Sequence, residues 1–584
     1  MFERRANGAV ALALSLLLGA ALWALLHRCL FEGQAQSHDA PLYVRSLWGI
    51  AHGDYNNSLL DYSSLAIHSQ LGLLLLAPFA RVWHAADVLI TAQALAFAAT
   101  HFVWLSALLR AARAAGVMGS LHAPWLSLLF SYGMPLVANP FVFDVRPEML
   151  GVFFATAGLL RGAERQRWDG VSIALLTASA AAREEFALVA ACGLMLAPVG
   201  RVALRTRAIW AVVCVAYFAA NSYIFQWARG EAQTAHLASA APWQDLALSK
   251  LQLLAAFVGA GGGLAMLGYR WLGSALPGLG MLALSTWMPS DQISFHYGMF
   301  VAPALLAASY TGYVAMLQKP RVWIAPHCAV ALGCGLFLSA LPGGARWKGE
   351  HFDLQGSPLS AAAWRAHSAW LAQVHQILQS VPREHSLLLQ YMFAAPYADR
   401  PSIRVLEVPN ANPWQPDAVL LPQKLWPTRG LQLREQGYRL SALAGSDFAL
   451  LSRRTSTPLA SVLSAHGCEG ASLSWPDAGI QLCNAWREAD GRVTVLLGRQ
   501  RSSDTRARLA LGAGPHFTTT LLPLDGLIEL ADLPEGRVVW STSRGALPSS
   551  QVTFTLHSAD DRIIPLFVHG KQKEGITLTL LPPR

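Results

Sequence analysis

Six acidic residues of this 584-residue chain stand between long apolar runs, in a region where charge is costly. An ionisable side chain at or near membrane depth is by default a functional hypothesis, because burying it away from water is unfavourable. A carboxylate at a membrane surface can take a proton from an acceptor hydroxyl, which is general-base chemistry. Within residues 1–341 these acids are Asp39, Asp144, Glu148, Glu184, Glu185 and Asp291.

Basic groups accompany several of these acids. Arg146 lies between Asp144 and Glu148, and Arg183 directly precedes two glutamates. A guanidinium group binds phosphate through paired hydrogen bonds, and a histidine can contribute to the same site. Two further candidates are His68 and His296. Such cations beside apolar walls predict a site for a phosphorylated lipid whose head lies at the membrane surface.

Structural roles compete with function at each position. Asp39 is a good helix N-cap residue, and Pro147 followed by Glu148 suits the first turn of a helix. A lone histidine such as His68 is more often structural, and Asp291 fits a polar turn without a role. Capping does not explain why Arg146 stands between two acids in an apolar neighbourhood. One arginine beside two glutamates also leaves a charge unpaired, so the sequence favours function at Glu184 and Glu185.

The composition indicates an integral membrane protein. Hydrophobic residues make up 53% of the chain and charged residues only 14%, against about 25% charged in soluble domains. The net charge of +9 is spread over many loops without a basic block, so no nucleic-acid partner is expected. We find no P-loop or zinc-protease motif. We expect no cofactor and no metal site, with a divalent metal as the alternative that stays open.

The apolar runs predict about eleven membrane-spanning helices, each of roughly 17–25 residues. Ala9–Leu26 is expected to be an uncleaved first helix, and Ala66–Trp83 an amphipathic helix lying in the membrane interface. Placing that segment in the interface puts the arginine-rich loops on the cytoplasmic side. The remaining predicted spans are 87–109, 122–139, 147–161, 171–183, 186–199, 208–226, 247–268, 272–288, 297–316 and 322–341. The pair 171–183 and 186–199 is short and predicts a broken or re-entrant hairpin.

Three regions follow from this pattern. Residues 1–344 form a helical membrane domain whose first exterior loop is 31–86. Residues 345–454 alternate helix and strand and predict a small α/β domain, whereas residues 455–584 alternate as strands and predict a β-rich module. Both would lie outside the cytoplasm, where Cys468 and Cys483 could form a disulfide. The expected location is a bacterial inner membrane, with a cytoplasmic N-terminus and a periplasmic or extracellular C-terminal part.

The order of the motifs resembles that of a bacterial family of multi-spanning proteins known as domain of unknown function 2079, placed in the GT-C glycosyltransferase superfamily. The similarity covers roughly residues 35–450. Two positions depart from the family pattern, since Arg146 replaces a histidine and Arg183 a lysine. The matching elements are Asp39, Leu47–Gly53, His68 before LLLLAPFARVW, Gln93, Phe143–Glu148, Arg183–Glu185 and Phe295–Tyr297.

The resemblance implies a GT-C-like fold and transfer of a sugar from a polyprenyl-phosphate donor at the exterior face. Asp39, in the first exterior loop, would be the catalytic base, and Arg146, Arg183 and His296 would bind the donor phosphate. The remaining site residues would orient these cations or the sugar: His68, Asp144, Glu148, Glu184 and Glu185. Two alternatives stay open, a transporter or flippase for a lipid-linked or anionic solute, and a non-catalytic envelope assembly protein. The acceptor is not identified.

Overall fold

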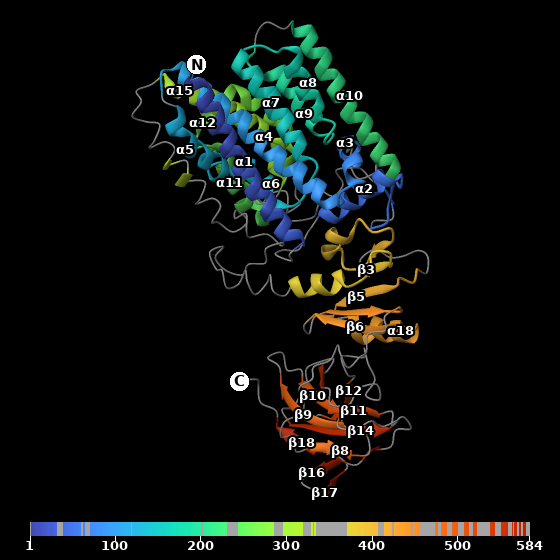
Figure 1. Cartoon of the computed structure of the whole chain (residues 1–584). Helices are drawn as coiled ribbons and strands as arrows, with labels where there is room; N and C mark the ends of the chain where they lie inside the picture. Colours follow the sequence, from blue (N-terminus) through green and yellow to red (C-terminus); the bar gives the residue numbers. More distant parts are fainter. Residues whose placement is uncertain are drawn as a thin grey trace. The chain divides into compact units, whose positions relative to one another are not determined.

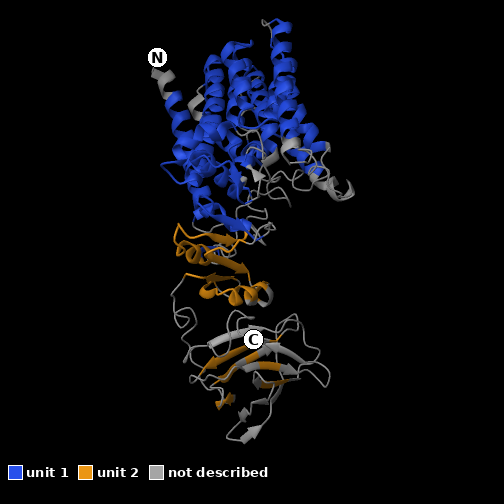
Figure 2. Ribbon diagram, turned by 90° about the vertical axis from the view of Figure 1, so that its right-hand side faces the viewer, with its two compact units in different colours: residues 1–372, 391–408 blue, residues 373–390, 409–584 orange. Residues whose placement is uncertain are grey.

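The computed structural model divides the chain into two compact units (Figure 2): residues 1–372 with 391–408, and residues 373–390 with 409–584. Within the first unit it describes residues 2–31, 39–59, 62–64, 71–117, 119–199, 203–229, 243–284, 296–318, 329–330, 332–333, 371–372 and 391–406. Within the second it describes 373–390, 414–422, 425–444, 448–454 and the strands between 473 and 579.

The first unit is helical, as Figure 1 shows. Its long helices α1, α4 and α7 pack side by side, and α8 packs on α7. The helices of the first half are α1 (Phe2–Phe31), α2 (Ala40–His52), α3 (Leu71–Ala80), α4 (Ala85–Ala114), α5 (Gly119–Tyr132), α6 (Pro135–Phe143), α7 (Met149–Arg165) and α8 (Gly170–Ser179). Those of the second half are α9 (Phe186–Leu196), α10 (Leu204–Arg229), α11 (Trp243–Val258), α12 (Leu264–Leu267), η3 (Tyr269–Ala275), α13 (Leu276–Leu284), η4 (His296–Phe300) and α15 (Ala302–Leu317).

The expected number of membrane spans is corrected by this architecture. Among the described residues only three helices are long and apolar enough to cross a membrane, Asn7–Phe31, Ala85–Ala114 and Leu204–Ile224. A fourth span results if α5 and α6, bent by 69° at their junction, count as one. Most of the remaining predicted spans form shorter or interrupted helices. The predicted span 322–341 lies almost wholly outside the described residues.

Proline and glycine explain why long apolar runs do not become long helices. Pro135 begins α6 directly after the break that follows α5, where its missing N–H costs nothing. The predicted span 247–268 is interrupted after α11 by Gly261, Gly262 and Gly263, whose φ angles are 60°, 65° and 83°. Glycine adopts this left-handed region without penalty, so the chain turns there.

The expected first exterior loop contains α2, a two-stranded ladder and α3. The ladder pairs β1 (Asn56–Asn57) with β2 (Tyr62–Ser63) in antiparallel register. Helix α3 has ten residues with Pro78 inside it, so it is about 15 Å long and too short to cross a bilayer alone. The interfacial position of Ala66–Trp83 stays a prediction.

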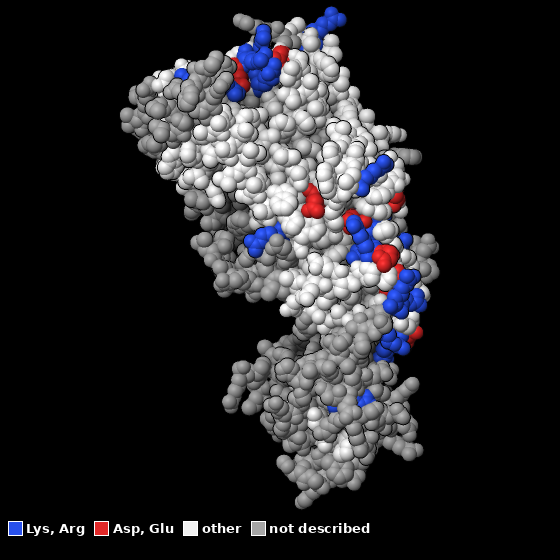
Figure 3. All heavy atoms as spheres, viewed as in Figure 1, with Lys and Arg blue, Asp and Glu red and all other residues white. Residues whose placement is uncertain are grey.

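Charged side chains mark two ends of the helical unit, and Figure 3 shows a broad face without Lys, Arg, Asp or Glu between charged regions. Helix α7 runs between these ends, with Glu148 before its first residue and Glu164 in its last turn. The two glutamates are 16 positions apart, which corresponds to about 24 Å of helix. That separation approaches the hydrocarbon thickness of a bilayer, about 30 Å.

The second unit contains the β structure. In the first part β3 (Leu387–Leu389) pairs in parallel with β5 (Ala418–Pro422), which pairs with β7 (Phe448–Ser452), which pairs with β6 (Arg439–Ala444). Short helices η9 (Trp426–Gly430) and α18 (Leu431–Glu435) connect β5 to β6. The first part of this unit thus combines helix and strand. β4 (Ile403–Val405) belongs to the first unit.

The C-terminal part of the second unit is β-rich, as predicted. One sheet has the order β13-β10-β9-β8-β16-β17, and the other has β12-β11-β14-β15 with β18 beside β14. Alternate residues such as Val493, Val495 and Leu497 are fully buried, which is typical of a sheet with one face in a core. The strands are β8 (Leu473–Trp475), β9 (Ile480–Arg487), β10 (Val493–Arg499), β11 (Ala507–Gly512), β12 (Thr518–Leu521), β13 (Val538–Thr542), β14 (Gln551–Ser558), β15 (Ile563–Ile564), β16 (Leu566–Val568), β17 (Lys571–Lys573) and β18 (Ile576–Thr579).

Candidate active site

Asp144 joins the turn before α7 to the start of α2. Its Oδ2 accepts the backbone N–H of Asp39 at 2.6 Å and that of Ala40 at 3.2 Å, and its Oδ1 accepts the N–H of Val145 at 2.8 Å. The first N–H groups of a helix have no partner within the helix and favour an anion. Asp144 therefore caps α2 from a distant segment and brings Asp39 to this turn.

Gln93 of α4 holds the same turn in place. Its Nε2 donates to the carbonyl oxygens of Phe141 and Asp144 at 2.7 and 2.8 Å, and its Oε1 accepts the N–H of Arg146 at 2.5 Å. The side chain is buried, so these hydrogen bonds satisfy backbone groups that water cannot reach. The sequence pointed to Gln93 only through the family resemblance, although a lone amide in an apolar helix is itself a signal.

Five charged side chains form a continuous series of ion pairs, which we call the ion-pair chain. Arg146 Nη2 contacts Asp39 Oδ2, and Arg146 Nη1 lies 3.8 Å from Glu148 Oε1. The same Glu148 oxygen lies 3.4 Å from Arg183 Nη1. Arg183 then donates to both carboxylate oxygens of Glu185, at 2.9 and 3.0 Å. The chain thus links the start of α2, the start of α7 and the turn between α8 and α9.

The middle of the ion-pair chain is buried and one end is accessible. The side chains of Glu148, Arg146 and Arg183 are 0%, 2% and 5% exposed, whereas that of Asp39 is 29% exposed. Buried ion pairs do not generally stabilise a fold, because desolvation offsets the attraction. Their burial beside an accessible carboxylate therefore favours a functional role.

Tyr43 of α2 completes the environment of Glu148. Its hydroxyl donates to Glu148 Oε1 at 2.5 Å. Burial, followed by the nearby negative charge of Glu148, raises the pKa of Tyr43 well above its ordinary value, so the phenol stays neutral and acts as a donor. Glu148 Oε2 is buried and has no hydrogen-bond partner among the described residues.

The remaining predicted site residues lie in the adjoining turn, in η4 or outside the described residues. Glu184 is fully buried in the turn that carries Arg183. His296 begins η4, and Phe300 at the other end of that short helix lies under the Arg183 guanidinium, 5.3 Å from ring centroid to Cζ. His68 and Asp291 lie outside the described residues.

The charge balance limits what the site can bind as it stands. Both guanidinium groups already face carboxylates, so a phosphate would bind Arg146 or Arg183 by replacing one of them. The accessible place for such an exchange is the Asp39 end of the chain. In the part of the chain that the structure describes, no three His, Cys, Asp or Glu side chains are placed to hold a metal ion.

Comparison with known proteins gives one match. A family model described as a predicted membrane protein (DUF2079) covers residues 34–428. No curated protein and no solved structure matches the chain. The matched region includes the whole ion-pair chain, together with Gln93 and Asp144.

Proposed function

We propose that this chain, which belongs to the DUF2079 family of predicted membrane proteins, is a membrane glycosyltransferase of the GT-C superfamily. Its donor would be a polyprenyl-phosphate-linked sugar, and transfer would take place at the exterior face of a bacterial inner membrane. The observation that carries the proposal is the contact between Asp39 and Arg146. It places an accessible carboxylate beside a guanidinium group that can bind phosphate.

Phosphate exchange on Arg146 gives Asp39 its role in this mechanism. A carboxylate held by a guanidinium is a weaker base than a free one. When the donor phosphate takes the place of Asp39 on Arg146, Asp39 is released next to the reacting sugar. Glu148, Tyr43 and Arg183 keep Arg146 in position from the buried side, as the distances above support.

The transfer step exchanges one C–O bond at the anomeric carbon for another. The acceptor hydroxyl oxygen attacks the anomeric carbon of the sugar and forms the new glycosidic C–O bond, while Asp39 accepts the hydroxyl proton. The bond between the anomeric carbon and the phosphate oxygen breaks, and polyprenyl phosphate leaves with that electron pair. Arg146 stabilises the negative charge that develops on the phosphate.

The proposed orientation places the ion-pair chain outside and the opposite end of α7 in the cytoplasm. That opposite end carries Arg110, Arg161 and Arg165, and cytoplasmic loops are enriched in arginine and lysine. The regions 345–454 and 455–584 would then be exterior. Cys483 is disulfide-bonded, which suits an oxidising compartment; its expected partner Cys468 lies outside the described residues.

The test uses the purified full chain in proteoliposomes with a panel of radiolabelled polyprenyl-phosphate hexoses. Release of free polyprenyl phosphate and labelled product measures transfer. Asp39→Asn should lower the rate by about 10²–10⁴-fold, the usual contribution of a general base. Asp54→Asn is the matched control, because Asp54 lies in the same segment and also pairs with an arginine, Arg45.

Three results would contradict the proposal. Transfer that survives Asp39→Asn at the wild-type rate removes the base assignment. Movement of the intact labelled lipid across the bilayer without chemical change would instead favour the flippase. Unchanged envelope phenotypes for Asp39→Asn, Arg146→Lys and Glu184→Gln in cells would favour a non-catalytic assembly protein.

A further inference from the structure

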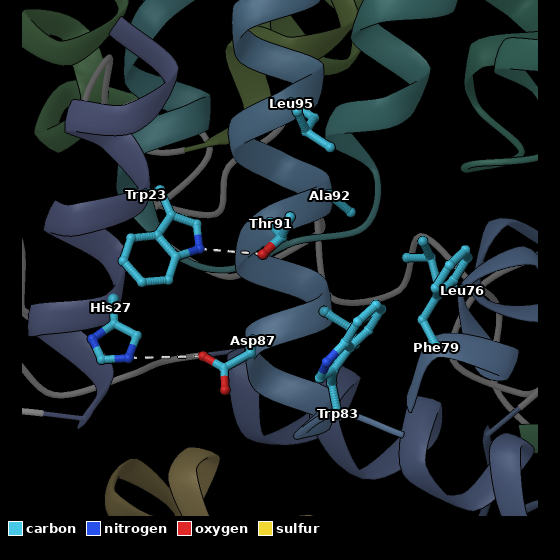
Figure 4. A pocket seen from close by; sticks show the side chains of 10 residues that line it. Trp23, His27, Leu76, Phe79, Trp83, Asp87, Thr91, Ala92 and Leu95 are labelled. Atoms are coloured by element: carbon cyan, nitrogen blue, oxygen red, sulfur yellow. Dashed lines mark hydrogen bonds and ion pairs between the residues drawn. The ribbon is translucent and has the colours of Figure 1, made fainter. Parts of the chain in front are cut away.

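An apolar groove lies between α1, α3 and α4, away from the ion-pair chain. Figure 4 shows its lining side chains, with α4 as the floor and Trp23 of α1 facing Leu76 and Phe79 of α3 across it. Its volume is about 610 Å³, within the range of small-molecule sites. Trp23 is fixed as a wall by its Nε1–H, which donates to Thr91 Oγ1 at 3.2 Å.

The position of the groove indicates that lipid, rather than water, fills it. Its floor belongs to α4 and one wall to α1, and both helices are long and apolar enough to cross a membrane. Large apolar side chains at its edges are exposed, Leu95 at 59% and Trp83 at 61%. Tryptophan is enriched where a bilayer meets water. The groove therefore extends from the expected interface into the apolar layer.

One end of the groove is polar. His27 of α1 and Asp87 of α4 face each other there, with 3.8 Å between Nε2 and Oδ1. That distance is too long for a hydrogen bond, and Asp87 Oδ1 is buried without a hydrogen-bond partner among the described residues. The helix dipole stabilises an acidic side chain in the first turn of α4. This explains why a negative charge is tolerated there, but it gives Asp87 Oδ1 no hydrogen-bond partner.

We propose that the groove binds a phospholipid of the bilayer whose head group carries a primary ammonium, such as a phosphatidylethanolamine. The ammonium pairs with the Asp87 carboxylate, whose side chain is 39% exposed, and the lipid phosphate lies beside the His27 ring. An acyl chain follows α4 from Asp87 to Leu95, which are eight residues or about 12 Å apart along the helix.

The charge at Asp87 distinguishes this lipid from the proposed sugar donor. A polyprenyl phosphate has an anionic head without a cation, and Asp87 would repel it. The groove lining includes none of the five residues of the ion-pair chain. The two sites nevertheless share α4, since Thr91 and Leu95 line the groove and Gln93 holds the turn that carries Arg146. A lipid in the groove would thus pack against the helix that positions the candidate active site.

The experiment is native mass spectrometry of the purified full chain in detergent, titrated with two lipids of identical acyl chains, phosphatidylethanolamine and phosphatidylglycerol. The wild type should retain the ethanolamine lipid at about tenfold lower concentration, the size of one charge-assisted hydrogen bond. Asp87→Asn should remove this preference. Ala92→Phe, which fills the groove floor, should weaken both lipids, whereas Leu128→Phe on the exposed face of α5 serves as the control.

Three outcomes would overturn the proposal: equal retention of the two lipids by the wild type, an unchanged preference in Asp87→Asn, or unchanged binding in Ala92→Phe. Polyprenyl phosphate is titrated in the same way as a third lipid. Stronger retention of it than of either phospholipid would also overturn the proposal and would assign the groove to the donor. Circular dichroism of each variant checks that the helices remain folded. Sugar transfer is not the readout, so failure here leaves the proposed function standing.

Discussion

The two ends of α7 carry the same residue type in opposite environments. Glu164, at one end, pairs with Arg110, whose side chain is 55% exposed, and nearby Arg165 is 45% exposed where it pairs with Asp169. Glu148, at the other end, is fully buried between two arginines that are almost equally buried. The same helix thus has a hydrated charged end and a dry one.

The difference shows which charges the fold can lose without consequence. Exposed ion pairs contribute little, since water already solvates both partners. Buried ones cost desolvation energy, and a chain that keeps them gains no stability over an apolar core. The hydrated end suits an interface with water and lipid head groups, whereas the dry end is where function is expected.

The largest difference in stability between the two ends should appear when Glu148 and Glu164 are replaced one at a time. Glu148→Gln leaves Arg146 and Arg183 buried with one carboxylate fewer, which should cost about 3–5 kcal/mol of unfolding free energy. Glu164→Gln at the other end should cost about 1 kcal/mol or less. Denaturant unfolding in detergent micelles measures both, and equal losses would erase the distinction between the ends.

The next contrast tests geometry at constant charge. Arg146→Lys keeps a cation but cannot contact Asp39 and Glu148 at once, so it should lose about 1.5–3 kcal/mol, one hydrogen bond to a charged group. Arg110→Lys is the control at the hydrated end, where a lysine can still reach Glu164. If both variants unfold at the same denaturant concentration, the planar guanidinium of Arg146 contributes no more to stability than a lysine ammonium would.

A smaller effect is expected from Tyr43→Phe. It removes the hydroxyl that donates to Glu148 Oε1 and should cost about 1–2 kcal/mol, because a buried acceptor loses a partner. Tyr55→Phe, an exposed tyrosine in the same segment, should have no measurable effect. The same unfolding assay measures both variants. If Tyr43→Phe leaves the free energy of unfolding unchanged, the two arginines alone hold Glu148.

The smallest effect concerns pH at the hydrated end. The hydrogen bond from Arg161, together with that from the N–H of Ser172, holds the pKa of Asp169 well below its ordinary value. Its stabilisation is therefore present above about pH 4 and is lost as the pH falls toward the folded-state value. Asp169→Asn keeps the helix cap and should cost about 1 kcal/mol or less at pH 6.

That difference between wild type and Asp169→Asn should shrink as the pH falls below 4. It should also shrink in 1 M salt, because the Debye length is then about 3 Å and the attraction between exposed charges is largely screened. Thermal unfolding followed by circular dichroism, at pH 6, at pH 3 and at pH 6 in 1 M salt, measures both dependences. A difference that grows on acidification would have the wrong sign for a depressed pKa.

Much of the local structure could be predicted from the sequence. Apolar length located α1, α4 and α10, and the polar triplet starting at Arg183 marked the turn between α8 and α9. The strand-like alternation in residues 455–584 predicted the β-rich C-terminal part, which contains β8 to β18. The number of spans was wrong because hydropathy measures how long an apolar run is, and does not show whether its backbone continues as one straight helix through Pro135 or through Gly261 to Gly263.

The candidate site was likewise predictable only in part. Residue type alone marked Asp39, Arg146, Glu148 and Arg183 as costly charges in an apolar half, because the free energy of burying a charge depends on chemistry and depth. Their pairing was decided only by the tertiary structure. Asp39 and Arg146 are 107 positions apart in the sequence, and they meet because Asp144 caps α2 and Gln93 fixes the turn before α7. These contacts depend on how three helices pack, which no local sequence pattern records.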